Sequence, residues 1–146
     1  MTEKEKMLKQ QLYDANHDTD LKLERVKAKE LCHQYNQLSP ADEQGQQKIL
    51  YQLLGKMGAN CCITAPFWCD YGYNIELGEN FYSNHNLVIL DCGKVTFGDN
   101  VFVAPDCGFH TAGHPIDYER RNQGLEYAYP ITVGDNVWTV SYTHLR

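Results

Sequence analysis

The chain has 146 residues, which suffices for one domain or for a domain with an extension. Its formal net charge is −6 and it carries no basic stripe, so neither nucleic acid nor an anionic membrane is an expected partner. No apolar run approaches the roughly 18 residues of a membrane span. The charged start Met1–Lys6 has no apolar segment behind it, so we expect no signal peptide, a cytoplasmic protein and reduced cysteines.

The first part of the chain, residues 1–58, is expected to be a helical domain. Its apolar residues recur at helical spacing beside many Lys and Glu, first in a short segment, then in residues 21–38, then in a third segment that begins near Ser39. Ser39 can cap this third helix, and Asp42 lies where a capping box has an acid. Because the helices are amphipathic and short, we expect them to pack on the start of the region that follows.

The second part, residues 59–138, repeats one short phrase. In each copy an apolar residue precedes Gly-Asp-Asn or Gly-Glu-Asn, and another apolar residue follows. The three copies are Ile75–Phe81, Val95–Val101 and Ile131–Val137. Self-similarity of this kind indicates a repeat architecture, in which each unit buries its apolar side chains against the next unit.

The spacing of the apolar residues indicates how the repeat folds. Apolar or small residues lie six apart around the phrases, a period that fits neither a helix face nor a plain alternating strand. Short strands joined by tight turns, with one apolar side chain per face pointing inward, fit this period. Gly and Asn tolerate the positive φ that such turns need. An antiparallel meander with three similar turns is the less favoured alternative.

One segment between the second and third copies of the phrase drops out of the repeat. It covers residues 108–130 and contains His110–Asp117, followed by a charged run. We expect a polar loop that projects from the coil, and loops held by a rigid scaffold often carry chemistry. His114 lies in this loop between Gly113 and Pro115, either as a reactive group or as a histidine that only makes local hydrogen bonds.

The end of the chain departs from the pattern. Aligning the third phrase on the second puts Thr139 where an apolar residue is expected, and the repeat does not continue. Residues 140–146 resemble the in-frame translation of a sequencing-library adapter. We therefore expect residues 139–146 to be a non-native tail, on a natural sequence that breaks off near Trp138 and leaves open strand edges on the last coil.

Several motifs, in a fixed order, carry a resemblance to a known family. They are Met7-Leu8 with Leu12-Tyr13-Asp14, Asp70-Tyr71-Gly72-Tyr73-Asn74-Ile75, Asn80-Phe81-Tyr82-Ser83-Asn84, Gly113-His114-Pro115, Gly124-Leu125-Glu126-Tyr127 and Pro130-Ile131-Thr132-Val133-Gly134. With them the chain resembles the maltose/galactoside O-acetyltransferase family from Met1 to Trp138. The resemblance implies a mainly β fold, a left-handed parallel β-helix of hexapeptide repeats preceded by a short helical domain.

The same resemblance implies an activity. Members of this family move an acetyl group from acetyl-CoA, a co-substrate, to a sugar hydroxyl, and the maltose-type members use the 6-hydroxyl of glucose or maltose. The resemblance further implies a homotrimer with active sites between neighbouring subunits. It implies no bound cofactor and no metal.

The resemblance also suggests roles for single residues. An alcohol is a weak nucleophile and needs a base as it attacks a thioester, and His114 matches the family's catalytic histidine. An unperturbed imidazole can accept a proton near neutral pH. Asp91 lies near the site in this interpretation with its role left open, Cys92 is the better match to the family's acidic site residue, and Asp14 lies near a sugar contact. The residues expected to contact the acceptor sugar, each of which can instead be an ordinary surface or packing residue, are Asp70, Tyr82, Asn84, Glu126 and Trp138.

Two alternatives stay open. His85, His110 and His114 suggest a three-histidine zinc site of the kind that β-helical carbonic anhydrases use, although their spacing does not match. Alternatively, the chain is a structural piece without activity, because the family's CoA contacts lie largely in coils after Trp138. We expect the longer parent to be an enzyme and the 146-residue chain itself to bind CoA weakly and turn over little.

Overall fold

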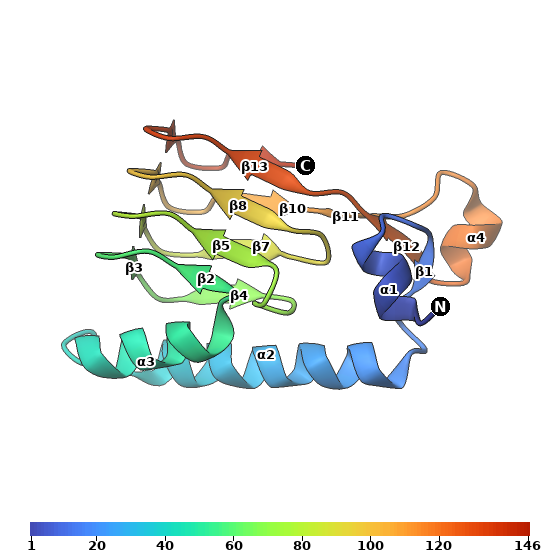
Figure 1. The fold of residues 1–146 in the computed structure, drawn as a ribbon, viewed down its shortest axis with the longest axis horizontal. Helices are drawn as coiled ribbons and strands as arrows, with labels where there is room; N and C mark the ends of the chain where they lie inside the picture. The colour runs from blue at the N-terminus through green and yellow to red at the C-terminus, as the bar shows by residue number, and fades with distance from the viewer.

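Three parallel sheets of four strands each form the faces of a coil in the computed structural model, which describes residues 1–146 (Figure 1). The first face consists of β2 (Lys56–Met57), β5 (Ile75–Leu77), β8 (Val95–Phe97) and β13 (Ile131–Val133). The second face consists of β3 (Cys62–Ile63), β6 (Tyr82–Ser83), β9 (Phe102–Val103) and β14 (Trp138–Thr139). The third face consists of β4 (Phe67–Cys69), β7 (Leu87–Leu90), β10 (Gly108–His110) and β15 (His144–Leu145).

The repeated phrase stacks in register, as the sequence predicts. Ile75 and Ile131 both pair with Val95 in parallel sheets, so the three copies lie above one another. The Asn of each copy has a positive φ of 56–59°, and the side chains of Asn80, Asn100 and Asn136 are joined in a ladder by hydrogen bonds of 3.0 and 3.4 Å. Because the pairing is parallel throughout the coil, the antiparallel meander is wrong.

Two helices, α2 (Thr19–Gln37) and α3 (Glu43–Leu53), cover the first turn of the coil. The side-chain amide of Asn36 donates to the carbonyl of Phe67 (3.1 Å) and its oxygen accepts the N–H of the same residue (2.9 Å). Buried side chains of both helices belong to one apolar core with the coil. The expectation that these helices pack on the repeat region is confirmed.

The start of α3 differs from the prediction. Asp42, not Ser39, caps the helix, because its carboxylate accepts the N–H of Gly45 at 2.9 Å. Ser39 instead closes a turn ahead of the helix, in which its hydroxyl accepts the N–H of Ala41 (3.2 Å) and its carbonyl accepts the N–H of Asp42 (2.9 Å). A carboxylate at the helix start also interacts favourably with the helix dipole.

The excursion from the coil is an ordered hairpin. A short helix, α4 (Tyr118–Asn122), connects β11 (Ala112–Gly113) to β12 (Leu125–Ala128), and the two strands pair in antiparallel fashion. The N-terminal strand β1 (Tyr13–Asp14), which follows α1 (Glu3–Leu8), adds to the free edge of β12 (Figure 1). The N-terminal segment and the excursion therefore form one three-stranded sheet beside the coil.

The boundaries of the coil differ from the predicted ones at three places. Residues 108–110 belong to the coil, because β10 pairs with β7, so the excursion begins only after His110. Residues 56–57 also belong to it, because β2 pairs with β5. At the other end, Thr139 pairs with Val103 and is buried, and β15 pairs with β10. The tail thus continues the coil, and its non-native origin stays a prediction.

Two further features concern the whole chain. All six cysteines are free, and five of them are buried while Cys62 is exposed. None of the helices has the length and apolar character that crossing a membrane requires.

Candidate functional site

His114 directly follows β11 at the root of the excursion, and its side chain is 47% exposed. Its Nδ1 lies 2.9 Å from the carbonyl oxygen of Leu125 on β12. Since a carbonyl only accepts, Nδ1 must carry the hydrogen, and the lone pair of the neutral ring is then on Nε2. The hairpin pairing of β11 with β12 thus orients the imidazole so that Nε2 is the basic atom.

Glu126 on β12 is the acidic neighbour of this ring. Its Oε1 lies 4.0 Å from Nε2 of His114, beyond hydrogen-bond distance but within range of a charge interaction. Its Oε2 accepts a hydrogen bond of 2.8 Å from the phenol of Tyr13 on β1. Two residues predicted for the site, His114 and Glu126, are therefore brought together by the excursion.

Asp70 follows β4 and lies further along the same polar network. Its Oδ1 is 3.1 Å from the ammonium of Lys29, and its Oδ2 accepts from the thiol of Cys92 at 3.4 Å. Burial raises the pKa of the Cys92 thiol, so it remains protonated between Asp70 and the Tyr13 phenol. Asp70 also lines a groove of about 920 Å³ along α2, which includes the half-exposed Trp68.

The other predicted contacts lie on the second face of the coil. Tyr82 and Trp138 both pair with Phe102, so their outward side chains form one column. With Asn84 they line a groove of about 480 Å³. The side-chain oxygen of Asn84 accepts the N–H of His85 at 2.8 Å, which leaves its amide N–H₂ for a ligand.

One chain does not bring these two groups together. The column of Tyr82 and Trp138 is on the sheet that contains β3, whereas Glu126 is on β12 and His114 directly follows β11, in the sheet beside the coil. These sheets lie at opposite sides of the molecule in Figure 1. A site that uses both groups therefore needs a second copy of the chain.

The histidines of the zinc alternative do not converge. The ring of His85 contacts the carbonyl of Ala65, between β3 and β4, whereas His114 contacts the excursion. Burial, and then the neighbouring His144, lower the pKa of His110. No group of three or more His, Cys, Asp or Glu side chains has an arrangement that could hold a metal ion. The chain therefore does not build the three-histidine site.

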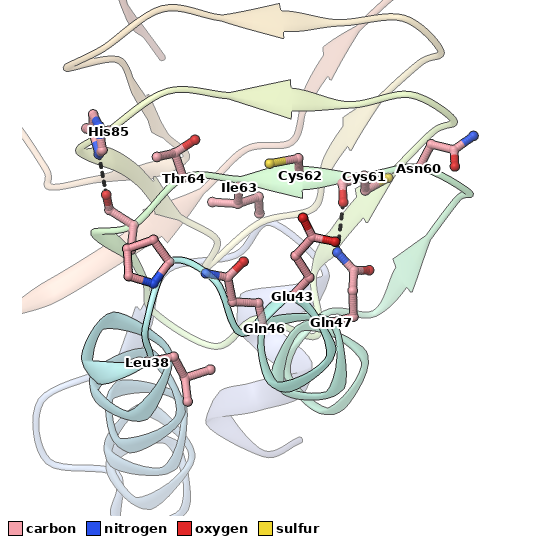
Figure 2. A pocket seen from close by; sticks show the side chains of 12 residues that line it. Leu38, Glu43, Gln46, Gln47, Asn60, Cys61, Cys62, Ile63, Thr64 and His85 are labelled. Carbon is pink, nitrogen blue, oxygen red and sulfur yellow. Dashed lines mark hydrogen bonds between the residues drawn. The ribbon is translucent and has the colours of Figure 1, made fainter.

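A further groove, of about 590 Å³, lies between α3 and the second face of the coil (Figure 2). Gln47 spans it at one side by donating to the carbonyl of Cys61 at 2.9 Å, and His85 lies at the other side. None of the residues predicted for catalysis or for sugar binding lines this groove.

Three neighbours of the site, Tyr13, Lys29 and Phe102, were not predicted from the sequence. Tyr13 belongs to one of the recognised motifs, but its partner Glu126 is 113 residues away, and a two-residue strand has no period to detect. Phe102 was detectable, because the aligned phrases put it in the same place as Trp138.

Comparison with known proteins supports the fold and the family. The family model for the maltose acetyltransferase hexapeptide capping motif matches residues 6–58. A galactoside acetyltransferase solved in complex with coenzyme A is similar with a TM-score of 0.93 and 33% identity, over 99% of this chain and 72% of that one. A maltose O-acetyltransferase from Clostridium difficile 630 is similar with a TM-score of 0.86 and 43% identity, over 96% of this chain and 74% of that one.

Relatives known by sequence agree. The Saccharomyces cerevisiae protein YJL218W, named as a candidate acetyltransferase, is 59% identical over 128 residues, which are 88% of this chain and 65% of the yeast protein. A Staphylococcus haemolyticus protein, SH0499, named in the same way, is 51% identical over 94% of this chain and 72% of its own length. The expected left-handed parallel β-helix behind a helical segment is confirmed. The chain belongs to the maltose/galactoside acetyltransferase family of hexapeptide-repeat proteins.

Proposed function

We propose that the whole protein is an acetyl-CoA-dependent sugar O-acetyltransferase, with His114 as the general base. The observation that carries this proposal is the orientation of the imidazole. Its Nδ1–H is held by the carbonyl of Leu125 and its Nε2 is accessible at the root of the excursion. Family membership supplies the reaction class, and two of the similar solved structures are named as complexes with coenzyme A or acetyl-CoA.

The proposed reaction needs one proton acceptor that later gives the proton back. Nε2 of His114 takes the proton of a sugar hydroxyl as the oxygen attacks the thioester carbonyl carbon. When the tetrahedral intermediate collapses, the C–S bond breaks and the thiolate of CoA leaves. The imidazolium then returns its proton to this thiolate, so that the products are an acetylated sugar and CoA.

The acceptor is proposed to bind between two copies of the chain. The groove with Tyr82, Asn84 and Trp138 offers an amide and aromatic surfaces, which suit the hydroxyls and the apolar faces of a sugar ring. The groove of one subunit would face the excursion of its neighbour in a homotrimer, which completes the set with His114 and Glu126. Maltose and glucose are the proposed acceptors, and the cytoplasm, where acetyl-CoA is available, is the proposed compartment.

The test is acetyl transfer from acetyl-CoA to maltose, glucose and galactosides. His114→Ala should lower turnover by roughly 10²–10⁴-fold, the usual contribution of a general base. His33→Ala, which removes an exposed histidine on α2, is the matched control and should leave turnover unchanged. Unchanged turnover in His114→Ala would remove this residue from the mechanism.

The assay must take into account that this chain is shorter than its relatives. The chain spans 65% of the yeast relative, and we propose that the 146-residue chain alone turns over little, because the resemblance places most CoA contacts after Trp138. The assay is therefore run on this chain and on the longer parent side by side. Robust turnover by the chain that ends at Arg146 would contradict this part of the proposal.

A further inference from the structure

The N-terminal strand β1 contacts the excursion at Glu126, the residue that faces the proposed base His114. In the antiparallel pairing of β1 with β12, Tyr13 lies directly opposite Glu126. The Tyr13 hydroxyl donates to Oε2 of Glu126 at 2.8 Å, while Oε1 of the same carboxylate lies 4.0 Å from Nε2 of His114. One carboxylate therefore connects the N-terminal segment to the imidazole.

Tyr13 is held firmly, and its hydroxyl donates its hydrogen to Glu126. Its side chain is 1% exposed and packs in an apolar cluster with Tyr71 and Cys92. Burial, with the neighbouring Cys92 and Glu126, raises the pKa of Tyr13 far above its ordinary value, so the phenol stays protonated. A protonated phenol beside a carboxylate can only donate to it, which fixes the direction of this hydrogen bond.

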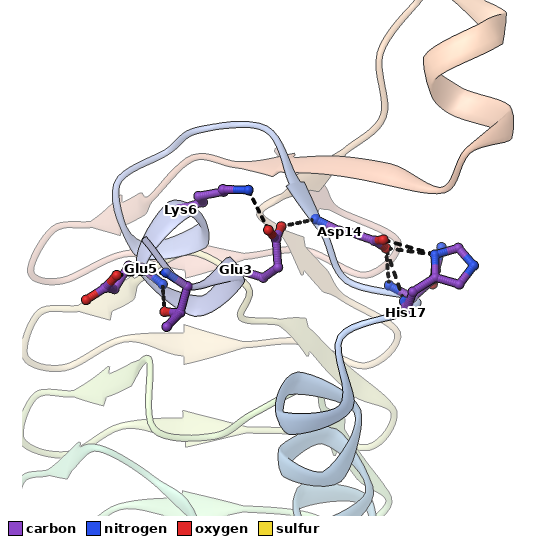
Figure 3. Close-up of polar contacts among 7 residues, drawn as sticks. Glu3, Glu5, Lys6, Asp14 and His17 are labelled. Atoms are coloured by element: carbon purple, nitrogen blue, oxygen red, sulfur yellow. Dashed lines mark hydrogen bonds and ion pairs between the residues drawn. The ribbon is translucent and has the colours of Figure 1, made fainter.

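The strand that carries Tyr13 is itself anchored by polar contacts (Figure 3). The N–H of Asp14 donates to Glu3 at 2.6 Å, and Lys6 holds the other oxygen of Glu3 at 2.5 Å. The carboxylate of Asp14 accepts the N–H of His17 at 3.1 Å and contacts its ring at 3.0 Å. In the turn that follows β1, the side chain of Asn16 donates to the carbonyl of Gly124 at 3.1 Å, so the N-terminal segment is hydrogen-bonded to the excursion here as well.

The charges around Glu126 leave His114 as its ion-pair partner. Three groups lie near the Glu126 carboxylate: the Tyr13 hydroxyl on β1, the Cys92 thiol on the coil, and the positively charged Arg25 on α2. The guanidinium of Arg25 is engaged elsewhere, with the Tyr71 hydroxyl at 2.7 Å and the carbonyl of Ala15 at 2.6 Å. Asp70 lies beyond Cys92 and is neutralised by Lys29.

We infer that Tyr13 is a positioning residue, which fixes the carboxylate of Glu126 so that this carboxylate stabilises the positive charge that develops on His114. The inference rests on the proposed role of His114 as the base. It gives Glu126 a function toward the imidazole in addition to the sugar contact expected from the sequence. It also makes the N-terminal segment part of the catalytic apparatus, although this segment lies at the far end of the sequence from β12.

The test measures the reactivity of the His114 ring without depending on turnover. Diethyl pyrocarbonate acylates the neutral imidazole and puts positive charge on the ring as it reacts, and peptide mass spectrometry gives the rate at each histidine. Y13F removes only the hydroxyl and should slow acylation of His114 roughly three- to tenfold, a size typical of coupled neighbours. His33 serves as an internal reference, and Y71F, which removes another buried hydroxyl of the same cluster, should leave the His114 rate unchanged.

A double-mutant cycle separates this role from a purely structural one. If Tyr13 acts through Glu126, Y13F has no further effect once E126Q has removed the charge. An equal slowing by Y13F in the wild-type and E126Q backgrounds would overturn the inference, as would an unchanged rate in Y13F alone. Should Y13F fail to fold, E126D keeps the charge but draws the carboxylate away from both partners, and wild-type reactivity in E126D would equally overturn the inference.

Acetyl transfer by the longer parent distinguishes the two proposals. In that protein Y13F should lower kcat by a similar factor and leave KM for acetyl-CoA unchanged. Full transfer activity in His114→Ala would reject the proposed function and with it the catalytic meaning of Tyr13. If His114→Ala abolishes transfer but the double-mutant cycle shows no coupling between Tyr13 and Glu126, only the inferred role of Tyr13 is rejected and the proposed function stands.

Discussion

The carboxylate of Asp91, at the end of β7, accepts the backbone N–H of Tyr71 one coil below at 2.9 Å. The same side chain accepts the N–H groups of Asp70 at 3.0 Å and Asn74 at 3.3 Å, and it is fully buried. One buried side chain thus holds the corner between β4 and β5, at which Asp70 lies. The structure gives Asp91 a role in the scaffold, whereas the sequence left its role open.

Removing this acceptor should destabilise the chain strongly. Asp91→Ala leaves three N–H groups without their partner, and each unsatisfied buried donor costs about 1–3 kcal/mol. Because the buried charge is removed at the same time, we expect a net loss of about 2–5 kcal/mol in the free energy of unfolding. Urea denaturation measures it, and Asp99→Ala offers a comparison with an exposed carboxylate that caps the neighbouring coil. If Asp91→Ala lowers the free energy of unfolding by less than Asp99→Ala does, the scaffold role of Asp91 is contradicted.

Asp91 should also give the stability a characteristic pH dependence. Burial raises the pKa of Asp91 from 3.8 to about 6. Between these values the folded state holds a proton that the unfolded state has lost, so this group's contribution to stability falls as the pH rises from about 4 to about 6. The difference of about two pKa units corresponds to about 3 kcal/mol.

The measurement compares the wild-type chain with Asp91→Asn in urea at several pH values between 4 and 7. Other carboxylates titrate in the same range, and the difference between the two proteins cancels their contribution. We expect the stability of Asp91→Asn relative to wild type to rise as the pH rises from about 4 to about 6 and then to stay constant. A difference that does not change with pH would show that the Asp91 carboxyl titrates normally.

The asparagine ladder predicts a backbone effect. Asn100 has a φ of 56°, where a side chain with a Cβ is strained and asparagine is tolerated better than most residues. Asn100→Ala should cost roughly 1–2 kcal/mol, and Asn100→Gly should cost less, since glycine adopts positive φ readily. Asn122→Ala, at an exposed position without positive φ, is the control. Equal losses for Ala and Gly at position 100 would mean that the side-chain ladder dominates.

How much of the fold and of the site could be predicted from the sequence depends on how far apart in the sequence the contacting residues lie. The coil followed from the sequence because its information is local, an apolar residue every sixth position and Gly-Asp-Asn or Gly-Glu-Asn in each copy of the phrase. His114 followed because Gly113 and Pro115 mark it within a segment that leaves the repeat. The contact between Tyr13 and Glu126 did not follow, since it joins a two-residue strand to a hairpin 113 residues away. The hand of the coil came from the resemblance alone.

The separation of the two residue groups gives the last prediction, because a site shared between subunits can be rebuilt from two defective chains. In the proposed trimer of the longer parent, we expect Asn84→Ala to raise KM for the proposed sugar acceptor more than KM for acetyl-CoA. His114→Ala and Asn84→Ala chains, each weakly active alone, are then coexpressed in equal amounts. Over all the randomly assembled trimers, about a quarter of the interfaces combine an intact His114 from one subunit with an intact Asn84 from the next, so about a quarter of wild-type activity should return. Chains that carry both substitutions, mixed with wild type, provide the control for random assembly. If the two single variants show no more activity together than apart, the sites lie within single chains, and the groove of Tyr82 and Trp138 is not the acceptor site.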